Sequence, residues 1–311
     1  MKISKITKSI NIKSQLIQYF RQRNIFTAFS SIIVNGTSQT ALEIVRLSVY
    51  NKLKKRLTKK YQYVFNSEKS SIKRLSTPPE NPVWIAWFDG IETAPDVVKK
   101  CYASALKNLD KFSVILITKE NLEDYIHLPD FIVKKYKDGI ISQTHFSDIL
   151  RLELLATYGG TWIDSTIYFS NNVFPESWFY SDIFFFQNLK PGKNGDAIPV
   201  STWFIHSIPE HEIIMNTREM LFEYWKNTDY LLDYFIMHQF LRISQERFEK
   251  KDKLIARFSN ATPHIFLLEW HRKYDEKRYK EIMEVSPIHK LTYKKLPEQA
   301  DSAFSFWFQN N

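Results

Sequence analysis

The sequence predicts an α/β protein that begins with a basic helical extension. Three observations carry this prediction. After about residue 80, short apolar runs typical of strands alternate with helical runs, and the order strand, helix, strand implies a parallel sheet. A helical run that ends at Gly159-Gly160 leads directly into another apolar run. Before residue 80 the apolar spacing is helical only.

The first quarter of the chain differs from the remainder in charge and pattern. Residues 14–29 and 40–61 have helical spacing, and Leu42, Val45 and Val49 recur at i, i+3 and i+7. Residues 1–80 carry 16 Lys and Arg against 3 Asp and Glu, a net of +13, whereas the remainder is slightly acidic. Residues 66–82 are polar, Ser-rich and closed by prolines, as linkers are. We expect an extension with its linker over residues 1–80 and a second domain over residues 81–311.

The second domain contains strands and helices in alternation. Strands are expected at 83–88, 112–118, 161–169, 182–187 and 200–206. Helices are expected at 94–107, 122–127, 130–135, 147–158, 208–225 and 230–243. The 311 residues suffice for one sizeable core with an appendage.

The stretch "SDILRLELLATYGGTWIDSTIYFS", residues 147–170, carries the candidate chemistry. Asp148 and Arg151 are three apart on a helix and therefore neighbours on one face. Period two in the following strand places Asp164 and Thr166 on a common face. If that strand ends at the carboxyl edge of a parallel sheet, these groups can grip a phosphorylated, hydroxyl-rich ligand. On local pattern alone, an ordinary surface ion pair followed by a plain strand remains the alternative.

The same stretch resembles a known signature. "SDILR…L…YGGTWID" is similar to the nucleotide-sugar motif of glycosyltransferases with the GT-A fold, which include capsular polysaccharide synthesis proteins, family-32 transferases and, more distantly, large glucosylating toxins. "PVWIAWFDGIETAPDVVKKCYAS", "YFIMHQF" and "SPIHKLTYK" resemble further blocks in the same order. The resemblance covers residues 80–296 and not residues 1–80. It implies a Rossmann-like, nucleotide-sugar-binding mixed sheet flanked by helices.

The resemblance also implies roles for individual residues. Trp87 corresponds to the aromatic residue that stacks on uracil, whereas Trp84 is expected in the core. Asp148 and Arg151 correspond to the pair that contacts the donor sugar and its phosphates, and the planar guanidinium suits phosphate oxygens. Asp164 corresponds to the first acid of the DxD motif, which binds sugar hydroxyls and reaches the metal.

The second acid of that motif is replaced by Thr166. A neutral hydroxyl is a poor sole anchor for Mn²⁺ or Mg²⁺, which prefer carboxylate oxygens. Either a divalent cation is held weakly by Asp164 and the diphosphate, or cationic side chains replace it. Three residues of the last block could supply the charge, the alternative being a solvated basic strand: His289, Lys290 and Lys294. His238 is a weaker candidate for the same role, because a histidine on the helical run 230–243 is more often simply packed.

These features together predict a hexosyltransferase of bacterial capsule or exopolysaccharide synthesis. It would transfer a sugar from a nucleoside-diphosphate donor, UDP in the first instance, to a lipid-linked oligosaccharide. Retention of the anomeric configuration is implied by the resemblance alone. The alternatives are a protein-modifying glycosyltransferase and a non-catalytic nucleotide-sugar-binding protein of the same fold. Binding without turnover would identify the second alternative.

The composition limits the compartment in which the protein is expected to act and the partners that it is expected to bind. A single cysteine, Cys101, excludes an internal disulfide and fits a reducing compartment. The first residues lack the features of a signal peptide, and no apolar run approaches the roughly 18 to 20 residues that span a bilayer. The basic residues of 1–80 are interspersed with apolar helix positions rather than base-stacking aromatics, so we expect no nucleic acid. We expect a cytoplasmic protein, peripheral on the inner face of the membrane, whose residues 1–80 face anionic lipid. The alternative for residues 1–80 is a helix pair that only solubilises the protein or packs between domains.

Overall fold

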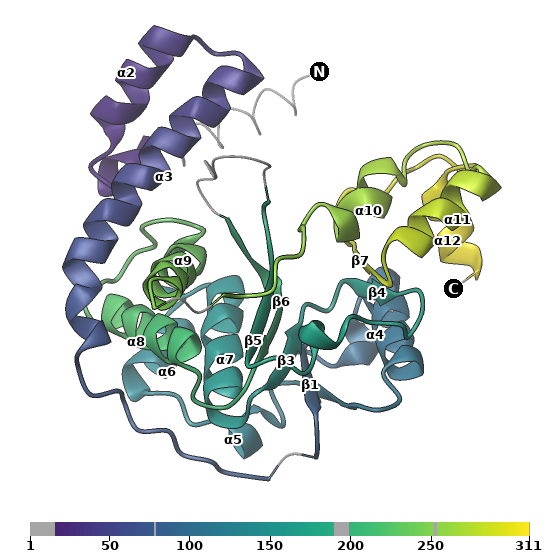
Figure 1. Ribbon diagram of the computed structural model, residues 1–311, viewed down its shortest axis with the longest axis horizontal. Helices are drawn as coiled ribbons and strands as arrows, with labels where there is room; N and C mark the ends of the chain where they lie inside the picture. Colours follow the sequence, from purple (N-terminus) through teal and green to yellow (C-terminus); the bar gives the residue numbers. More distant parts are fainter. Residues whose placement is uncertain (1–15, 78, 190–198, 252–253, 311) are drawn as a thin grey trace.

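The computed structural model describes residues 16–77, 79–189, 199–251 and 254–310. Its centre is a mixed five-stranded sheet flanked by helices (Figure 1), as predicted. The strand order is β2-β1-β3-β6-β5. The strands are β1 (Pro82–Ala86), β2 (Ser113–Ile117), β3 (Gly160–Ile163), β5 (Ile183–Gln187) and β6 (Val200–Ser207). β1 is parallel to β2 and β3, whereas β6 is antiparallel to both of its neighbours, β3 and β5.

Helices cover both faces of this sheet because its strands are apolar on both sides. Trp84 and Trp162 face one core, which is shared with the helices of the left half of Figure 1. Val83 and Phe204 face the other core, to which α4 contributes Ala105. The helices of the first layer are α5 (Leu122–Tyr125), α6 (Asp130–Lys137), α7 (Gln143–Tyr158), α8 (Glu212–Lys226) and α9 (Ile236–Glu249); α4 (Asp96–Asn108) lies across the sheet from them.

The two glycines between α7 and β3 are required by close packing. Gly159 has φ +67° and Gly160 has φ +84°, a region that side chains rarely adopt. A Cβ on Gly160 would lie 2.3 Å from the carbonyl oxygen of Pro82, and a Cβ on Gly159 would lie 2.7 Å from that of Ser207. The Gly-Gly pair therefore ends α7 and lets β3 enter the sheet beside β1.

The strand predicted over residues 161–169 is broken, which corrects the sequence analysis. β3 ends at Ile163, residues 165–166 form a turn, and β4 (Ile167–Phe169) starts a second sheet with β7 (Ile288–Lys290). The backbone N–H of Asp164 still bonds the carbonyl of Trp203, and that of Ile167 bonds the carbonyl of Asp164. The chain leaves the main sheet here because β7, a partner distant in the sequence, pairs with the residues that follow.

The last part of the chain forms a small helical layer that the sequence analysis did not anticipate. It comprises α10 (Ile265–Glu269), α11 (Glu276–Val285) and α12 (Ala303–Asn310), at the right of Figure 1. Phe266 and Trp307 pack there against Cys101 of α4. This layer packs against the β4–β7 sheet.

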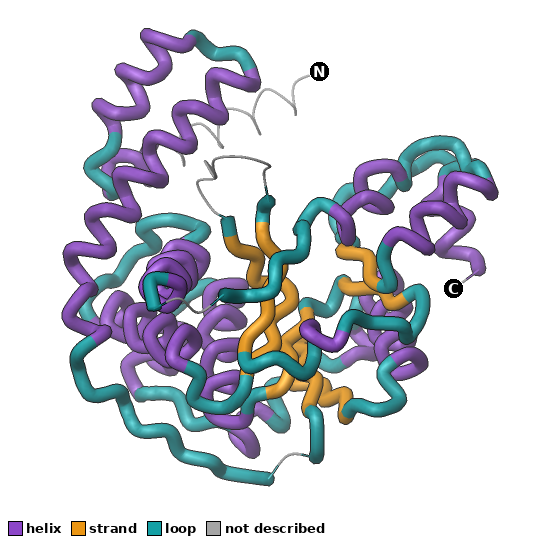
Figure 2. Tube along the Cα trace, in the orientation of Figure 1, coloured by secondary structure: helices purple, strands orange, loops and turns teal. Residues whose placement is uncertain are grey.

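The basic extension is helical, as predicted, but it is not one uniform run. Residues 16–21 are helical, the chain turns at Arg23 with φ 51°, and α2 (Ile25–Asn35) follows, so the helix predicted over 14–29 is interrupted; residues 14 and 15 lie outside the described ranges. α2 pairs with α3 (Gln39–Tyr61) as a hairpin at one corner of the molecule (Figure 2). In α3 the buried positions repeat every four residues, and Leu42 is exposed rather than buried. The carboxyl half of α3 packs on α9.

Candidate active site

Helix α7 supplies the first two site residues. Ser142 caps its amino end by accepting the backbone N–H of His145, and its apolar residues are buried between the sheet and α8. Asp148 and Arg151 lie on the same face, as predicted, with Arg151 Nη1 3.5 Å from Asp148 Oδ1. Both side chains are buried: 11% of Asp148 and 6% of Arg151 remain exposed. Charges so little exposed to water require compensation by neighbours.

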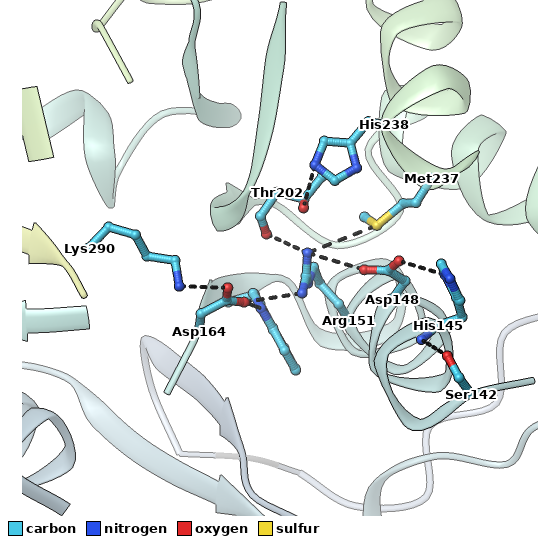
Figure 3. Close-up of polar contacts among 10 residues, drawn as sticks. Ser142, His145, Asp148, Arg151, Asp164, Thr202, Met237, His238 and Lys290 are labelled. Atoms are coloured by element: carbon cyan, nitrogen blue, oxygen red, sulfur yellow. Dashed lines mark hydrogen bonds and ion pairs between the residues drawn. The ribbon is translucent and has the colours of Figure 1, made fainter. Parts of the chain in front are cut away.

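Arg151 is the centre of the cluster (Figure 3). Its Nη1 donates to the carbonyl oxygen of Thr202 on β6 at 2.6 Å, and its Nη2 lies 3.2 Å from Asp164 Oδ1. The guanidinium also lies over the ring of Trp162, 4.8 Å from its centroid. Arg151 therefore fixes Asp148 and Asp164 relative to each other across α7 and the end of β3.

Lys290 completes the cluster from β7. Its Nζ lies 3.3 Å from Asp164 Oδ2 and donates to Thr166 Oγ1. The backbone N–H of Leu291 bonds the carbonyl of Thr166 at 2.8 Å, which holds the turn after β3 against the end of β7. Thr166 and Lys290 are thus brought together from positions more than 120 residues apart in the sequence. The ammonium lies between the carboxylate of Asp164 and the hydroxyl of Thr166.

Two cations determine the charge state of Asp164. Burial alone would raise the pKa of its carboxyl, but Lys290 and Arg151, with hydrogen bonds from Trp162 and Lys290, outweigh that effect and hold the pKa below its ordinary value. Trp162 Nε1 donates to Asp164 Oδ1 at 3.2 Å. Asp164 is therefore ionised at neutral pH, and 29% of its side chain is exposed to solvent.

Two histidines border the cluster. His145 Nδ1 lies 3.5 Å from Asp148 Oδ2, on the side away from Arg151 (Figure 3). His238, on α9, shares a hydrogen bond of 3.2 Å with Thr202 Oγ1, and burial lowers its pKa to about 4. His238 is therefore neutral at pH 7. Its Nδ1 has no hydrogen-bond partner among the residues that the structure describes. His238 is thus a packed helix histidine, as expected, and it also lies beside the cluster, as its weaker candidacy for the site requires.

Several aromatic side chains lie near the charged cluster. Trp87 follows β1, is half-buried, and meets Tyr293 edge-to-face with ring centroids 5.6 Å apart. Trp84 is fully buried, as expected, and its Nε1 donates to the carbonyl of Gly159. Tyr234 is 52% exposed, and burial followed by the carboxylates of Asp148 and Asp164 raises its pKa. Sequence reasoning did not select Tyr234 or Tyr293, although both lie inside the quoted blocks.

Two of the three candidate cations lie elsewhere. His289 is fully buried, and because successive residues of a strand point to opposite faces, its ring faces away from Lys290 and packs near Tyr168 and Phe266. Burial lowers the pKa of His289 to about 3, so it carries no charge at neutral pH. Lys294 is exposed, with its Nζ 5.6 Å from the ring centroid of Tyr293. Of the three, only Lys290 contacts Asp164 in the structure.

The residues present do not suit a divalent cation. Both oxygens of Asp164 already face cations, Arg151 and Lys290, and Thr166 accepts a hydrogen bond from Lys290. In the described parts of the chain, no group of three or more His, Cys, Asp and Glu side chains could hold a metal ion. Hard cations prefer several carboxylate oxygens, which this arrangement does not offer.

The cluster lies where a ligand is expected. Asp164 directly follows β3, and Trp87 directly follows β1, so both stand at the carboxyl ends of adjacent parallel strands. That edge is the usual ligand site of α/β sheets. A separate pocket of about 570 Å³ opens beside the same edge and is lined by Phe88 and Phe146, the neighbours of Trp87 and of the SDxxR motif. The fold and the cluster together define an α/β protein with a charged side-chain cluster at the carboxyl edge of its sheet.

The chain belongs to the family described as capsular polysaccharide synthesis protein, which it matches over residues 30–308. The predicted resemblance is confirmed, and it extends beyond residues 80–296 to include most of the basic extension. A search of curated proteins found no match. Among solved structures, the chain is similar to one titled PaToxG Glycosyltransferase, at 16% identity and a TM-score of 0.33, over 66% of this chain and 86% of that one.

Proposed function

We propose that this protein is a glycosyltransferase of the GT-A type that transfers a hexose from a UDP-sugar, with retention, to a lipid-linked oligosaccharide. Membership in the capsular polysaccharide synthesis family supports the polysaccharide context. The observation that carries the proposal is the contact of Lys290 with both Asp164 and Thr166, beside Arg151, at the carboxyl edge of the sheet. Two fixed cations beside one ionised carboxylate suit a ligand that carries both phosphates and hydroxyls.

Each side chain then has a defined task. The half-buried ring of Trp87, with Tyr293 at its edge, stacks on the base. The carboxylates of Asp148 and Asp164 accept hydrogen bonds from sugar hydroxyls. Lys290 and Arg151 face the diphosphate.

Catalysis consists mainly of orientation and charge stabilisation. The bond between the anomeric carbon and the β-phosphate oxygen breaks, and negative charge accumulates on the departing nucleoside diphosphate. Lys290 and Arg151 are already in place to stabilise that charge, so no reorganisation is needed as the bond breaks. A new bond then joins the anomeric carbon to the acceptor oxygen, and the acceptor's proton passes to the departing β-phosphate oxygen.

Lys290 takes the part that a divalent cation plays in metal-dependent relatives of this proposed class. Because an ammonium carries one charge instead of two, Arg151 is needed as the second cation. We therefore expect activity without added metal and only a modest effect of EDTA.

A donor screen tests the proposal. The full chain is incubated with a panel of nucleotide sugars, and released nucleoside diphosphate is measured with and without EDTA. Isothermal titration with the same panel is run in parallel. Release of nucleoside diphosphate from one UDP-sugar supports the proposal. Binding without hydrolysis or transfer would identify a non-catalytic nucleotide-sugar-binding protein.

The proposal also includes a lipid-linked acceptor and association of the protein with a membrane. None of the helices that the structure describes is long and apolar enough to cross a bilayer. The net charge of +13 over residues 1–80 supports attraction to an anionic surface. An acceptor carried by that surface would be within reach of a protein held there.

A further inference from the structure

A hollow at the base of the N-terminal hairpin is lined by cations. This basic pocket has a volume of about 550 Å³ and lies between α3 and the segment that joins α8 to α9. Its cationic lining residues are Arg21, Arg23, Arg56, Lys59 and Lys60. Its other lining residues are apolar, aromatic or threonine, and none is acidic. Within the described ranges, none of the five cations forms an ion pair.

The basic pocket is a concave surface with uncompensated positive charge. Contacts with the protein hold part of its lining: Arg56 Nη1 donates to the carbonyl of Gln22, and the guanidinium of Arg21 lies 4.9 Å from the ring centroid of Tyr230. A hollow lined by one sign of charge concentrates counter-ions. Arg and Lys together are the usual ligands of phosphate groups. The chemistry that fits this pocket is therefore a phosphate.

The part of the hairpin that adjoins the pocket indicates where that phosphate comes from. Residues 24–42, which comprise α2 and the turn into α3 and are here called the hairpin tip, contain no charged side chain. Large apolar side chains of the tip face solvent: Phe26 is 83% exposed, Phe29 63%, Ile33 68% and Val34 80%. Figure 1 shows α2 standing away from the sheet and its covering helices. An apolar helix surface next to a cluster of basic side chains, such as the basic pocket, is typical of helices that lie in a membrane interface.

We propose that the basic pocket binds the phosphate headgroup of an anionic phospholipid while the hairpin tip enters the boundary between headgroups and acyl chains. This is more specific than the attraction by net charge proposed above, because it assigns a site and adds an apolar contribution that salt does not screen. It does not depend on the transferase chemistry.

The basic pocket is also close to the candidate active site. The segment between α8 and α9 lines the pocket with Tyr230 and Leu232 and borders the carboxylate cluster with Tyr234. Four residues of backbone span at most about 14 Å. Gln22 of the extension donates to Asp233 of this segment at 2.6 Å, which ties the two regions together. A lipid held in the pocket therefore places the membrane surface beside the donor site.

Vesicle co-sedimentation of the full chain tests the proposal. The vesicles contain phosphatidylcholine with or without phosphatidylglycerol, at low and high salt. Arg23→Gln with Lys59→Gln should weaken binding to the anionic vesicles about thirtyfold, at roughly 1 kcal/mol for each cation. Lys107→Gln with Lys111→Gln removes the same charge from exposed positions outside the pocket and should leave binding within about threefold of wild type.

The tip is tested separately. Wild-type protein should retain part of its binding at high salt, and Phe26→Ser with Phe29→Ser should abolish that part, since each Phe is worth about tenfold or more when buried. Val173→Ser, at a position 77% exposed elsewhere, is the matched control and should bind as wild type. Donor hydrolysis should be unchanged in every variant, so failure here is distinguishable from failure of the transferase proposal.

Four results would overturn the inference. If the pocket double variant and the control double variant lost vesicle binding equally, net charge alone would explain the binding and the pocket would have no specific role. Complete loss of wild-type binding at high salt would exclude insertion of the tip. Tight binding only to vesicles that carry a polyprenyl diphosphate would assign the pocket to a lipid-linked acceptor instead. A wild-type dimer in sedimentation velocity that Phe26→Ser with Phe29→Ser converts to a monomer would make the tip a self-association surface.

Discussion

Replacement of Lys290 by Met isolates the proposed role of its charge. Met preserves most of the aliphatic stem and removes the ammonium, which lies 3.3 Å from Asp164 Oδ2 and donates to Thr166 Oγ1. At that distance and an effective dielectric constant of about 20, two unit charges interact by about 5 kcal/mol, and desolvation offsets much of this in the free protein. The diphosphate of the bound donor already interacts with this ammonium, and the additional charge that develops as the bond breaks strengthens the interaction in the transition state.

We therefore expect Lys290→Met to lower kcat by about a hundredfold or more, the usual cost of removing one preorganised donor, with a smaller change in KM. Lys294→Met is the control, because Lys294 is exposed beside Tyr293 and has no contact with Asp164 in the structure; it should lower kcat less than about tenfold. The assay is steady-state release of nucleoside diphosphate from the donor that the screen identifies.

An independent measurement follows the carboxylate itself. Because Lys290 helps to hold the pKa of Asp164 below its ordinary value, Lys290→Met should raise that pKa, and carboxyl carbon-13 chemical shifts can report it in both proteins. Wild-type turnover in Lys290→Met would refute the reasoning. Complete inhibition of wild type by EDTA with rescue by Mn²⁺ would do the same, since a metal would then supply the charge.

Four further predictions concern the same site and its surroundings. Thr166→Asp combined with Lys290→Ala supplies the missing carboxylate and frees its space, so Mn²⁺ affinity measured by titration calorimetry should rise well above that of Lys290→Ala alone. Arg151→Ala should lower turnover about a hundredfold and also lower the free energy of unfolding by about 3–5 kcal/mol, because two carboxylates would lose a buried partner; urea unfolding measures the second effect. Trp87→Ala should weaken UDP binding about tenfold in the same calorimetry, whereas Trp87→Phe should retain most of it. Burial raises the pKa of Asp233 to about 6, so the folded protein loses stability as pH rises from about 4 to above 6; Asp233→Asn should flatten that loss, up to about 3 kcal/mol, in urea titrations across the window.

Local sequence patterns were sufficient to predict those structural features that depend on neighbouring residues or on a single period. The spacing of Asp148 and Arg151 on a helix predicted their contact, because residues three apart on a helix are neighbours whatever the tertiary structure. The glycines after α7 predicted its end, and the order of strands and helices predicted β1 parallel to β2. These features depend on backbone conformation and on a single period.

Long-range pairing decided what the sequence left open. Asp164 and Thr166 were expected on one uninterrupted strand, but pairing of β4 with β7 turns the chain between them. The same pairing decides which basic residue of the last block reaches Asp164. Alternation along β7 sends Lys290 to the carboxylate and buries the adjacent His289 on the other face, and no property of the segment alone indicates which face will meet the site.

The sequence by itself determined the class of the sheet, the basic character of the first 80 residues, and the choice of Asp164 and Arg151 as members of one candidate site, which the structure places in contact. Only the tertiary structure decided that Lys290 occupies the space beside Asp164, and that the apolar residues of α2 face outward while the stripe of α3 is buried. Periodicity fixes which side chains share a face of an element, but a face acquires its environment only when a distant part of the chain packs against it or leaves it exposed.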